Sequence, residues 1–158
     1  YGGQAMKPNP ISLGRKALVQ HLQSITAANG YSTNAGHNVK TGWVNEVLET
    51  EKENLPLICV QKGKDLAPKP GPDGLIKYSG FSVVGVISAP LTDYEDAIDD
   101  LERDMLLALS PTSSARQRWM PVGITGITVG APEQYPPGQG EPTARVLIPV
   151  HLHTIIER

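Results

Sequence analysis

The sequence predicts an α/β (α+β) domain: a mixed, mostly antiparallel sheet of four to five strands, with two main helices packed on it and long loops rich in proline and glycine. Three observations support this fold class. Two segments place their apolar residues at helical spacing. Other segments are short apolar runs, or alternate apolar and polar residues as β-strands do. The 14 prolines and 16 glycines gather mainly between those segments, where loops connect them.

Length and composition fit one domain, with residues 1–11 as a flexible lead-in and residues 12–158 as the folded part. The net charge of −2 gives no bulk attraction to nucleic acid or to an anionic membrane. Aromatic residues make up 5% of the chain, too few for a platform that stacks several bases. No segment approaches the roughly 20 apolar residues of a membrane span, and the start lacks the pattern of a signal peptide.

The first helix is predicted from Ser12 to Ala28. Ser12 is a suitable N-cap, and Asn29-Gly30 suits a left-handed residue that ends the helix. His21 lies beside the apolar stripe and is interpreted as a half-buried helix residue rather than a ligand. The stripe itself consists of Leu18, Leu22 and Ile25.

Residues 31–54 are predicted as an extended segment and loop, with a short acidic turn of helix at 47–53. Leu55 to Gln61 then has the pattern of a buried strand, and Cys59 within it is interpreted as a small core residue. Gly63 to Gly74 contains three prolines and is predicted to be a loop without regular structure.

The longest strand is predicted from Ile76 to Ala89. It is apolar on both faces, which indicates a central position in the sheet or one face given to a partner. One face carries Phe81, Val83, Gly85 and Ile87, and the other carries Val84 and Val86.

The second helix begins at Thr92, because Thr92 followed by Glu95 forms a capping box. Its buried stripe is predicted to consist of Tyr94, Ile98, Leu101, Met105 and Ala108, with Leu109 beside it. Three acidic residues lie off that stripe, so a solvated helix face is favoured over a metal site. These are Asp99, Asp100 and Asp104.

Two more strands are predicted in the last third, at Gly123–Gly130 and Ala144–Ile156. The loop Ala131–Thr143 between them contains four prolines and is too long for a tight hairpin. Pro149 cannot donate a ladder hydrogen bond, so it predicts an edge position or a bulge.

No segment carries a recognisable set of catalytic residues. His151 and His153 point the same way on one strand, but no third metal ligand lies near them in the sequence. No phosphate-binding loop, dinucleotide fingerprint or nucleophile elbow is present, and the hydroxyls of Ser110–Ser114 have no neighbouring base. The sequence therefore predicts no enzyme, no cofactor and no metal.

Arg116, Arg118 and Trp119 form a small basic-aromatic patch before the fourth strand. Trp119 either anchors a loop against the core or, with the two arginines, contacts a partner or passing nucleic acid. Trp43 is a further candidate for partner contacts, as is Tyr135 in the long loop.

Taken together, the order of elements resembles the tail terminator proteins of long-tailed bacteriophages. The resemblance spans the chain from about Leu13 onward, although the loop Ala131–Thr143 is longer than the family leads one to expect. It rests on Arg15–Leu22, Asn29–Gly36, Leu55–Val60, Ser82–Val86, the acidic helix Asp93–Leu109 and the closing strand Val146–Ile156.

What the resemblance implies is a structural protein of the virion, assembled in the host cytoplasm. Such proteins form a ring, usually a homohexamer, that caps the head-proximal end of the tail tube. The ring ends polymerisation of the tail tube protein and joins the tail to the head–neck connector proteins. It needs no cofactor and no membrane, and duplex DNA passes through its pore without specific binding.

Two alternatives stay open at this point. One is another neck or tail-completion (head–tail joining) protein of the virion. The other, from a different class, is a small α/β enzyme or ligand-binding domain. Oligomeric state separates these classes, because a ring around a pore supports a virion protein whereas a monomer with a deep polar pocket supports an enzyme.

Overall fold

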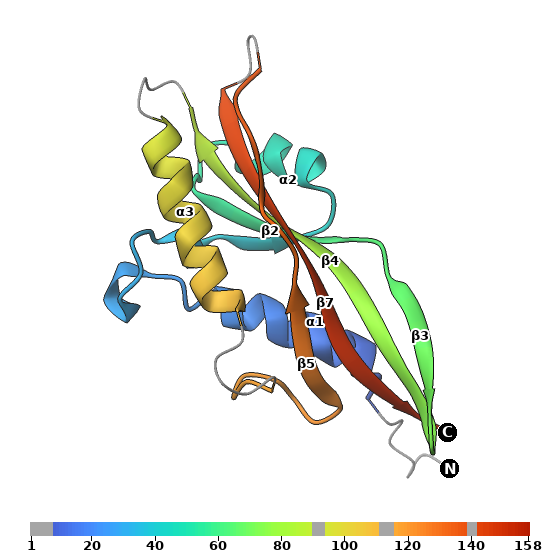
Figure 1. Cartoon of the computed structure of the whole chain (residues 1–158). Coiled ribbons are helices and arrows are strands. Elements are labelled where there is room, and N and C mark those ends of the chain that lie inside the picture. Colours follow the sequence, from blue (N-terminus) through green and yellow to red (C-terminus); the bar gives the residue numbers. More distant parts are fainter. Residues whose placement is uncertain (1–7, 90–93, 111–115, 139–141) are drawn as a thin grey trace, which may run out of the picture.

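The computed structural model describes residues 8–89, 94–110, 116–138 and 142–158, which form three α-helices and a seven-stranded sheet (Figure 1). The predicted class is confirmed, although the sheet has more strands than the four to five expected. No helix among these residues is long and apolar enough to span a membrane. The elements are α1 Pro10–Leu22, β1 Val39–Thr41, α2 Val44–Glu51, β2 Leu57–Lys62, β3 Leu66–Gly71, β4 Gly74–Ser88, α3 Tyr94–Leu109, β5 Ile124–Val129, β6 Glu133–Tyr135 and β7 Thr143–Glu157.

The antiparallel pair of β4 and β7 forms the centre of the sheet, with fifteen residue pairs from Gly74↔Glu157 to Ser88↔Thr143. β2 and β3 share the other edge of β4, where β2 pairs with its second half and β3 with its first. β5 and β6 share the outer edge of β7 in the same way. Since β1 pairs in parallel with β2, the sheet is mixed but mostly antiparallel.

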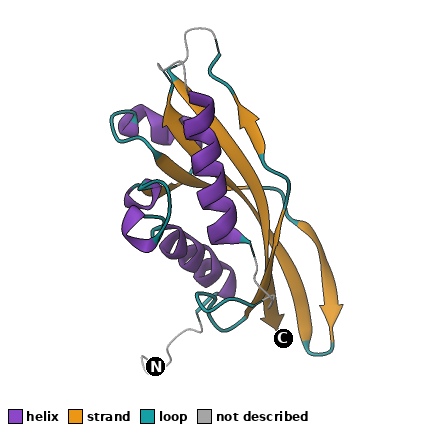
Figure 2. Cartoon of the chain, turned by 60° about the vertical axis from the view of Figure 1, so that its left-hand side comes forward, coloured by secondary structure: helices purple, strands orange, loops and turns teal. Residues whose placement is uncertain are grey.

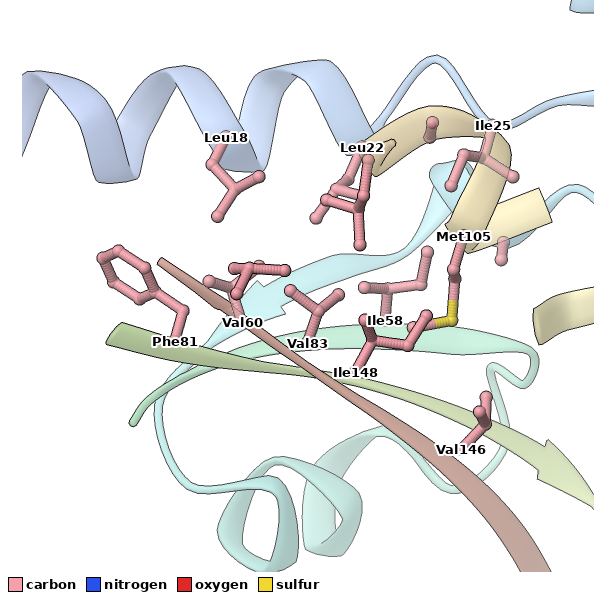
Figure 3. Close-up of a cluster of buried hydrophobic side chains, with 14 of the residues drawn as sticks. Leu18, Leu22, Ile25, Ile58, Val60, Phe81, Val83, Met105, Val146 and Ile148 are labelled. Atoms are coloured by element: carbon pink, nitrogen blue, oxygen red, sulfur yellow. The ribbon is translucent and has the colours of Figure 1, made fainter. Parts of the chain in front are cut away.

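Helices α1 and α3 cover one face of the sheet and form the main core with it (Figure 2). Leu18 and Leu22 of α1 lie over the strands, and Met105 of α3 packs beside them (Figure 3). The predicted stripes of both helices are buried, apart from Tyr94, which is half-buried, and so is the predicted face of β4 that carries Phe81 and Val83. The strand residues of this core include Ile58, Val60, Phe81, Val83, Val146 and Ile148.

The opposite face of the sheet is covered by α2 over part of its area. Val47 and Leu48 pack there beside the buried Val44. The sheet residues of this smaller cluster are Leu57, Cys59, Val84, Val86 and Leu147. Both faces of β4 are thus apolar because each meets a helix layer, which confirms its predicted central position. Cys59 is buried, as its interpretation as a core residue requires.

The first helix begins and ends earlier than its sequence pattern indicates. Asn9 is the N-cap and accepts a hydrogen bond from Ile11 N–H at 3.0 Å, while Pro10 occupies the first turn, where it has no amide hydrogen to leave unpaired. The predicted lead-in 1–11 therefore extends into the helix. The helix ends at Leu22, and a 3₁₀ turn at Ala27–Asn29 leads into Gly30, which has a φ of 91°.

Asp104 is not on a solvated face, and that part of the prediction for the acidic helix is wrong. The side chain is 1% exposed. Its carboxylate accepts hydrogen bonds from Ser32 N–H at 3.0 Å, Thr33 N–H at 2.7 Å and the Thr33 hydroxyl at 2.7 Å. Asp104 therefore holds the segment that follows α1 against α3. Asp99 and Asp100 are exposed, as predicted, whereas the capping residue Thr92 lies outside the described residues.

The segment Gly63–Gly74 is not an irregular loop, because it contains β3. β2 and β3 lie on the same edge of β4, and Asp65 stands at the break between them. Its carboxylate accepts hydrogen bonds from Gly80 N–H at 2.8 Å and from the ammonium groups of Lys62 and Lys77. Burial alone would raise the pKa of Asp65, but these hydrogen bonds lower it well below its usual range.

Pro149 lies in an inner strand of the sheet rather than at an edge. At this position β5 has ended and β6 has not begun, so no neighbouring carbonyl needs an amide hydrogen from Pro149. Its carbonyl still accepts a hydrogen bond from Gly130 N–H at 2.7 Å. The predicted loop Ala131–Thr143 likewise contains a short strand, β6, which pairs with residues 145–147.

The assignment of the α3 stripe to the core can be tested by comparing two leucines of that helix. Leu101 is 0% exposed and Leu107 is 66% exposed. We expect Leu101→Asp to lower the free energy of unfolding by about 3–5 kcal/mol, because it buries an unpaired charge. Leu107→Asp is the matched control and should change it by less than about 0.5 kcal/mol. Urea denaturation measures both, and equal effects would contradict the assignment.

A second pair tests the anchoring role of Asp104. Asp104→Ala leaves two backbone N–H groups without their acceptor, so we expect it to lower the free energy of unfolding by about 2–4 kcal/mol. Asp100→Ala on the same helix removes an exposed carboxylate 3.7 Å from Arg103 and should cost no more than about 0.5 kcal/mol. Hydrogen exchange at Ser32 and Thr33 should speed up in the first variant alone. Unchanged protection there would argue against the anchor.

Candidate subunit interface

A groove of about 500 Å³ lies between α2 and the hairpin formed by β6 and the first part of β7. We call this hairpin, at residues 133–138 and 142–147, the arm; it stands at one end of the sheet (Figure 1). The groove is on the sheet face that α2 partly covers. Its walls include Val44 from α2, Val84 from β4, and Arg145 and Leu147 from β7.

Polar side chains surround the apolar floor of the groove. Gln61 accepts a hydrogen bond from Val44 N–H at 3.0 Å, which occupies the first amide of α2. Arg145 is half-buried and is the one charged side chain among the described residues that line the groove. Within the described residues it forms no ion pair or side-chain hydrogen bond. The groove therefore presents a positive charge beside an apolar surface.

A second hollow, of about 280 Å³, lies on the other side of the arm, against the first turns of α3. Its charged lining residues are Glu95 and Asp99, both exposed. Gln134 donates hydrogen bonds to Asp99 at 2.8 Å and to Glu102 at 3.2 Å, so β6 is held against α3. The arm thus separates a basic groove on one face of the sheet from an acidic hollow on the other.

One of the predicted partner residues, Tyr135, lines this groove, and a second, Trp43, is the chain neighbour of a lining residue. Tyr135 is 46% exposed and lines both hollows, while Trp43 is 63% exposed and directly precedes Val44. The Tyr135 hydroxyl donates to the Glu133 carboxylate at 2.6 Å, and this hydrogen bond raises the pKa of Tyr135. Exposed aromatic rings beside an apolar groove are typical of a protein–protein contact.

The other three predicted residues lie at the opposite end of α3. Trp119 stacks on His21, with ring centroids 4.7 Å apart and an interplanar angle of 8°, and packs against the core. Arg116 donates to the Met120 carbonyl at 2.9 Å, whereas Arg118 is exposed. The structure thus agrees with the interpretation in which Trp119 anchors a loop, and it separates this patch from the groove.

His21 connects this loop to both helices. Its Nε2 lies 2.7 Å from the carbonyl oxygen of Ala108, which belongs to the last turn of α3. Burial lowers the pKa of His21, against a smaller opposite effect of that hydrogen bond. A neutral imidazole then donates to the carbonyl and leaves a flat face for the indole of Trp119. His21 is half-buried, as predicted, and serves as a packing residue.

The two histidines of β7 lie on the same face of the sheet, as predicted, but each has its own partner. His153 Nε2 is 2.7 Å from the Thr128 hydroxyl, and His151 Nε2 is 3.0 Å from the Lys64 carbonyl. Burial, and to a smaller extent repulsion from His151, lower the pKa of His153. Among the residues that the structure describes, no three His, Cys, Asp or Glu side chains converge as metal ligands.

Cys59 lies in β2, on the face of the sheet that α2 partly covers. Its thiol donates to the Gly42 carbonyl at 3.3 Å, and burial raises the pKa of Cys59 to about 11. The thiolate that a nucleophilic mechanism requires is therefore disfavoured at neutral pH.

Comparison with models of known protein families and with characterised proteins finds no match for this sequence. The groove itself was not foreseen from the sequence. Arg145 stands in an alternating strand segment, where an outward charge is ordinary. The sequence signals near the groove are Trp43 and Tyr135, two aromatic residues outside any apolar stripe.

The two tryptophans of the chain allow a direct test of these assignments. We expect Trp119→Ala to lower the free energy of unfolding by about 2–3 kcal/mol, because it removes a half-buried ring from the core edge. Trp43→Ala should leave it within about 0.5 kcal/mol, since that ring is mostly solvated. Denaturation monitored by circular dichroism measures both variants. A stability loss at position 43 as large as that at 119 would contradict the view of Trp43 as a surface contact residue.

Proposed function

We propose that this chain is a structural virion protein, a tail terminator that forms a ring on the head-proximal end of a bacteriophage tail tube. The resemblance to that family implies that the ring is a homohexamer. In this role it ends polymerisation of the tail tube protein and joins the tail to the head–neck connectors. The order of helices and strands supports the proposal, because five of the six segments that carry the resemblance fall in α1, β2, β4, α3 and β7.

The observation that carries the proposal is the arm with a different hollow on each side. A closed ring of identical subunits needs a heterologous contact, in which one surface of a subunit binds a different surface of the next. The groove and the acidic hollow are two such surfaces, and the partly exposed ring of Tyr135 lines both. The net charge of −2 is compatible with a pore through which DNA slides.

The enzyme alternative gains less support from the same groove. Among the described lining residues, Arg145 is the one charged side chain, and no His, Cys, Asp or Glu that could act as a catalytic base accompanies it. A ligand-binding monomer would still present a polar groove of this size. Oligomeric state therefore remains the measurement that separates the two proposals.

We expect the purified protein to form rings with an open centre in negative-stain electron micrographs, and to sediment as one oligomer well above the mass of the 17.0 kDa chain. Tyr135→Ala should weaken this assembly by roughly tenfold or more, because an interfacial aromatic residue commonly contributes over 1 kcal/mol. Val122→Ala is the control, since Val122 is 88% exposed and precedes β5, whose first residue pairs with Thr154, toward the other end of β7 from the arm.

Added to growing tail tubes, the assembled protein should stop elongation at one end. A chain that stays monomeric even at high micromolar concentration, and leaves tube growth unchanged, would contradict the proposed function.

A further inference from the structure

We propose that Arg145 of one subunit forms an ion pair with Glu95 of the next, so that the basic groove and the acidic hollow meet across each contact of the ring. This inference rests on the proposed ring and names the surfaces that close it. Arg145 belongs to the arm and Glu95 lies beside it in α3, and the two line hollows on opposite faces of the sheet.

Arg145 brings a positive charge into the groove. Its side chain is half-buried in a groove that Val44, Val84 and Leu147 also line, and the described lining residues include no carboxylate. A guanidinium taken partly out of water loses hydration and is stabilised by an opposite charge that enters the same site. The groove is therefore suited to a carboxylate supplied from outside the subunit.

The acidic hollow offers such a carboxylate. Glu95 is exposed in the first turn of α3, and no residue in the described part of the chain forms an ion pair with it. Asp99 beside it accepts a hydrogen bond from Gln134, which leaves its negative charge in place. The nearest cation on this helix, Arg103, points to Asp100 and the Ser32 hydroxyl instead. The hollow is thus negative and unneutralised.

The positions of the two sites determine the kind of contact. Arg145 and Ala144 are neighbours in β7 and point to opposite faces of the sheet, one into the groove and the other into the hollow. Tyr135 and Pro136 line both sites from the arm between them. A subunit can therefore bind one neighbour on each side of its arm. A chain of such contacts is heterologous, and it closes into a ring when its rotation closes.

Charge reversal tests the pairing. We expect Arg145→Glu and Glu95→Arg each to weaken assembly at least about tenfold, because each places like charges across every contact. Asp96→Arg is the matched control: Asp96 is exposed in the same first turn of α3 but does not line the hollow. That variant carries the same penalty at the helix N-terminus and should assemble like the unaltered protein. Sedimentation velocity at equal concentration measures all three.

Mixing the two reversed variants gives the decisive readout. In a 1:1 mixture, subunits of the two kinds can alternate around a ring of even number, and every contact then pairs opposite charges. We therefore expect rings from the mixture at concentrations where neither variant forms them alone. If a reversed variant fails to fold, as its melting temperature would show, Arg145→Gln and Glu95→Gln replace it and should each weaken assembly and reduce its salt dependence.

The outcomes separate the pairing from the proposed function. Rings from Arg145→Glu or Glu95→Arg alone, or a mixture that assembles no better than its components, would overturn the pairing while the ring itself stands. An unaltered protein that never assembles would overturn both.

Discussion

The structure depends on the register between β4 and β7, two strands separated in the chain by α3, β5 and β6. This pairing is non-local, and every other element is placed by it. β2 and β3 line up on β4, and β5 and β6 line up on β7. Because side chains alternate along a strand, a slip of one residue would move either Val83 of β4 or Ile148 of β7 out of the main core. The burial of both sets of side chains therefore fixes the register, and the register fixes the arm.

The elements that the sequence predicts well are those whose own residues are periodic. The stripes of α1 and α3 and the two faces of β4 follow from spacing alone, because each buries enough apolar surface to determine its own conformation. The missed strands β3 and β6 have no such pattern. β3 contains prolines and exposed residues, and β6 has three exposed residues, so both are strands because a neighbour offers hydrogen-bonding groups. Whether a neighbour presents those hydrogen-bonding groups depends on the register of β4 and β7, and this register cannot be read from a short segment of the sequence.

The same limit applies to charged residues. Asp99 and Asp104 both lie off the apolar stripe of one helix, yet one is exposed and the other is buried under three hydrogen bonds. The difference is made by Ser32 and Thr33, which lie 72 and 71 residues away in the chain and bring unpaired donors to the site. Arg145 could not be singled out for the same reason, since the groove around it is made by α2 and the arm. Sequence spacing reports which face a residue occupies, but not what covers that face.

The arm shows how one constraint can produce both rigidity and an exposed binding surface. β6 is held to β7 by strand pairing and to α3 by Gln134, so its aromatic residue Tyr135 is held in place although nearly half of its surface is exposed. A surface that is ordered before it binds loses less conformational entropy when a partner docks. Pro149 lies where the pairing of β7 with β5 has ended and the pairing with β6 has not begun. Because Pro149 has no amide hydrogen, this break in the pairing leaves no donor of that residue without a partner. In the proposed ring the contacts are made by a preformed arm, and the association then depends on charge and shape rather than on folding of the arm at the moment of assembly.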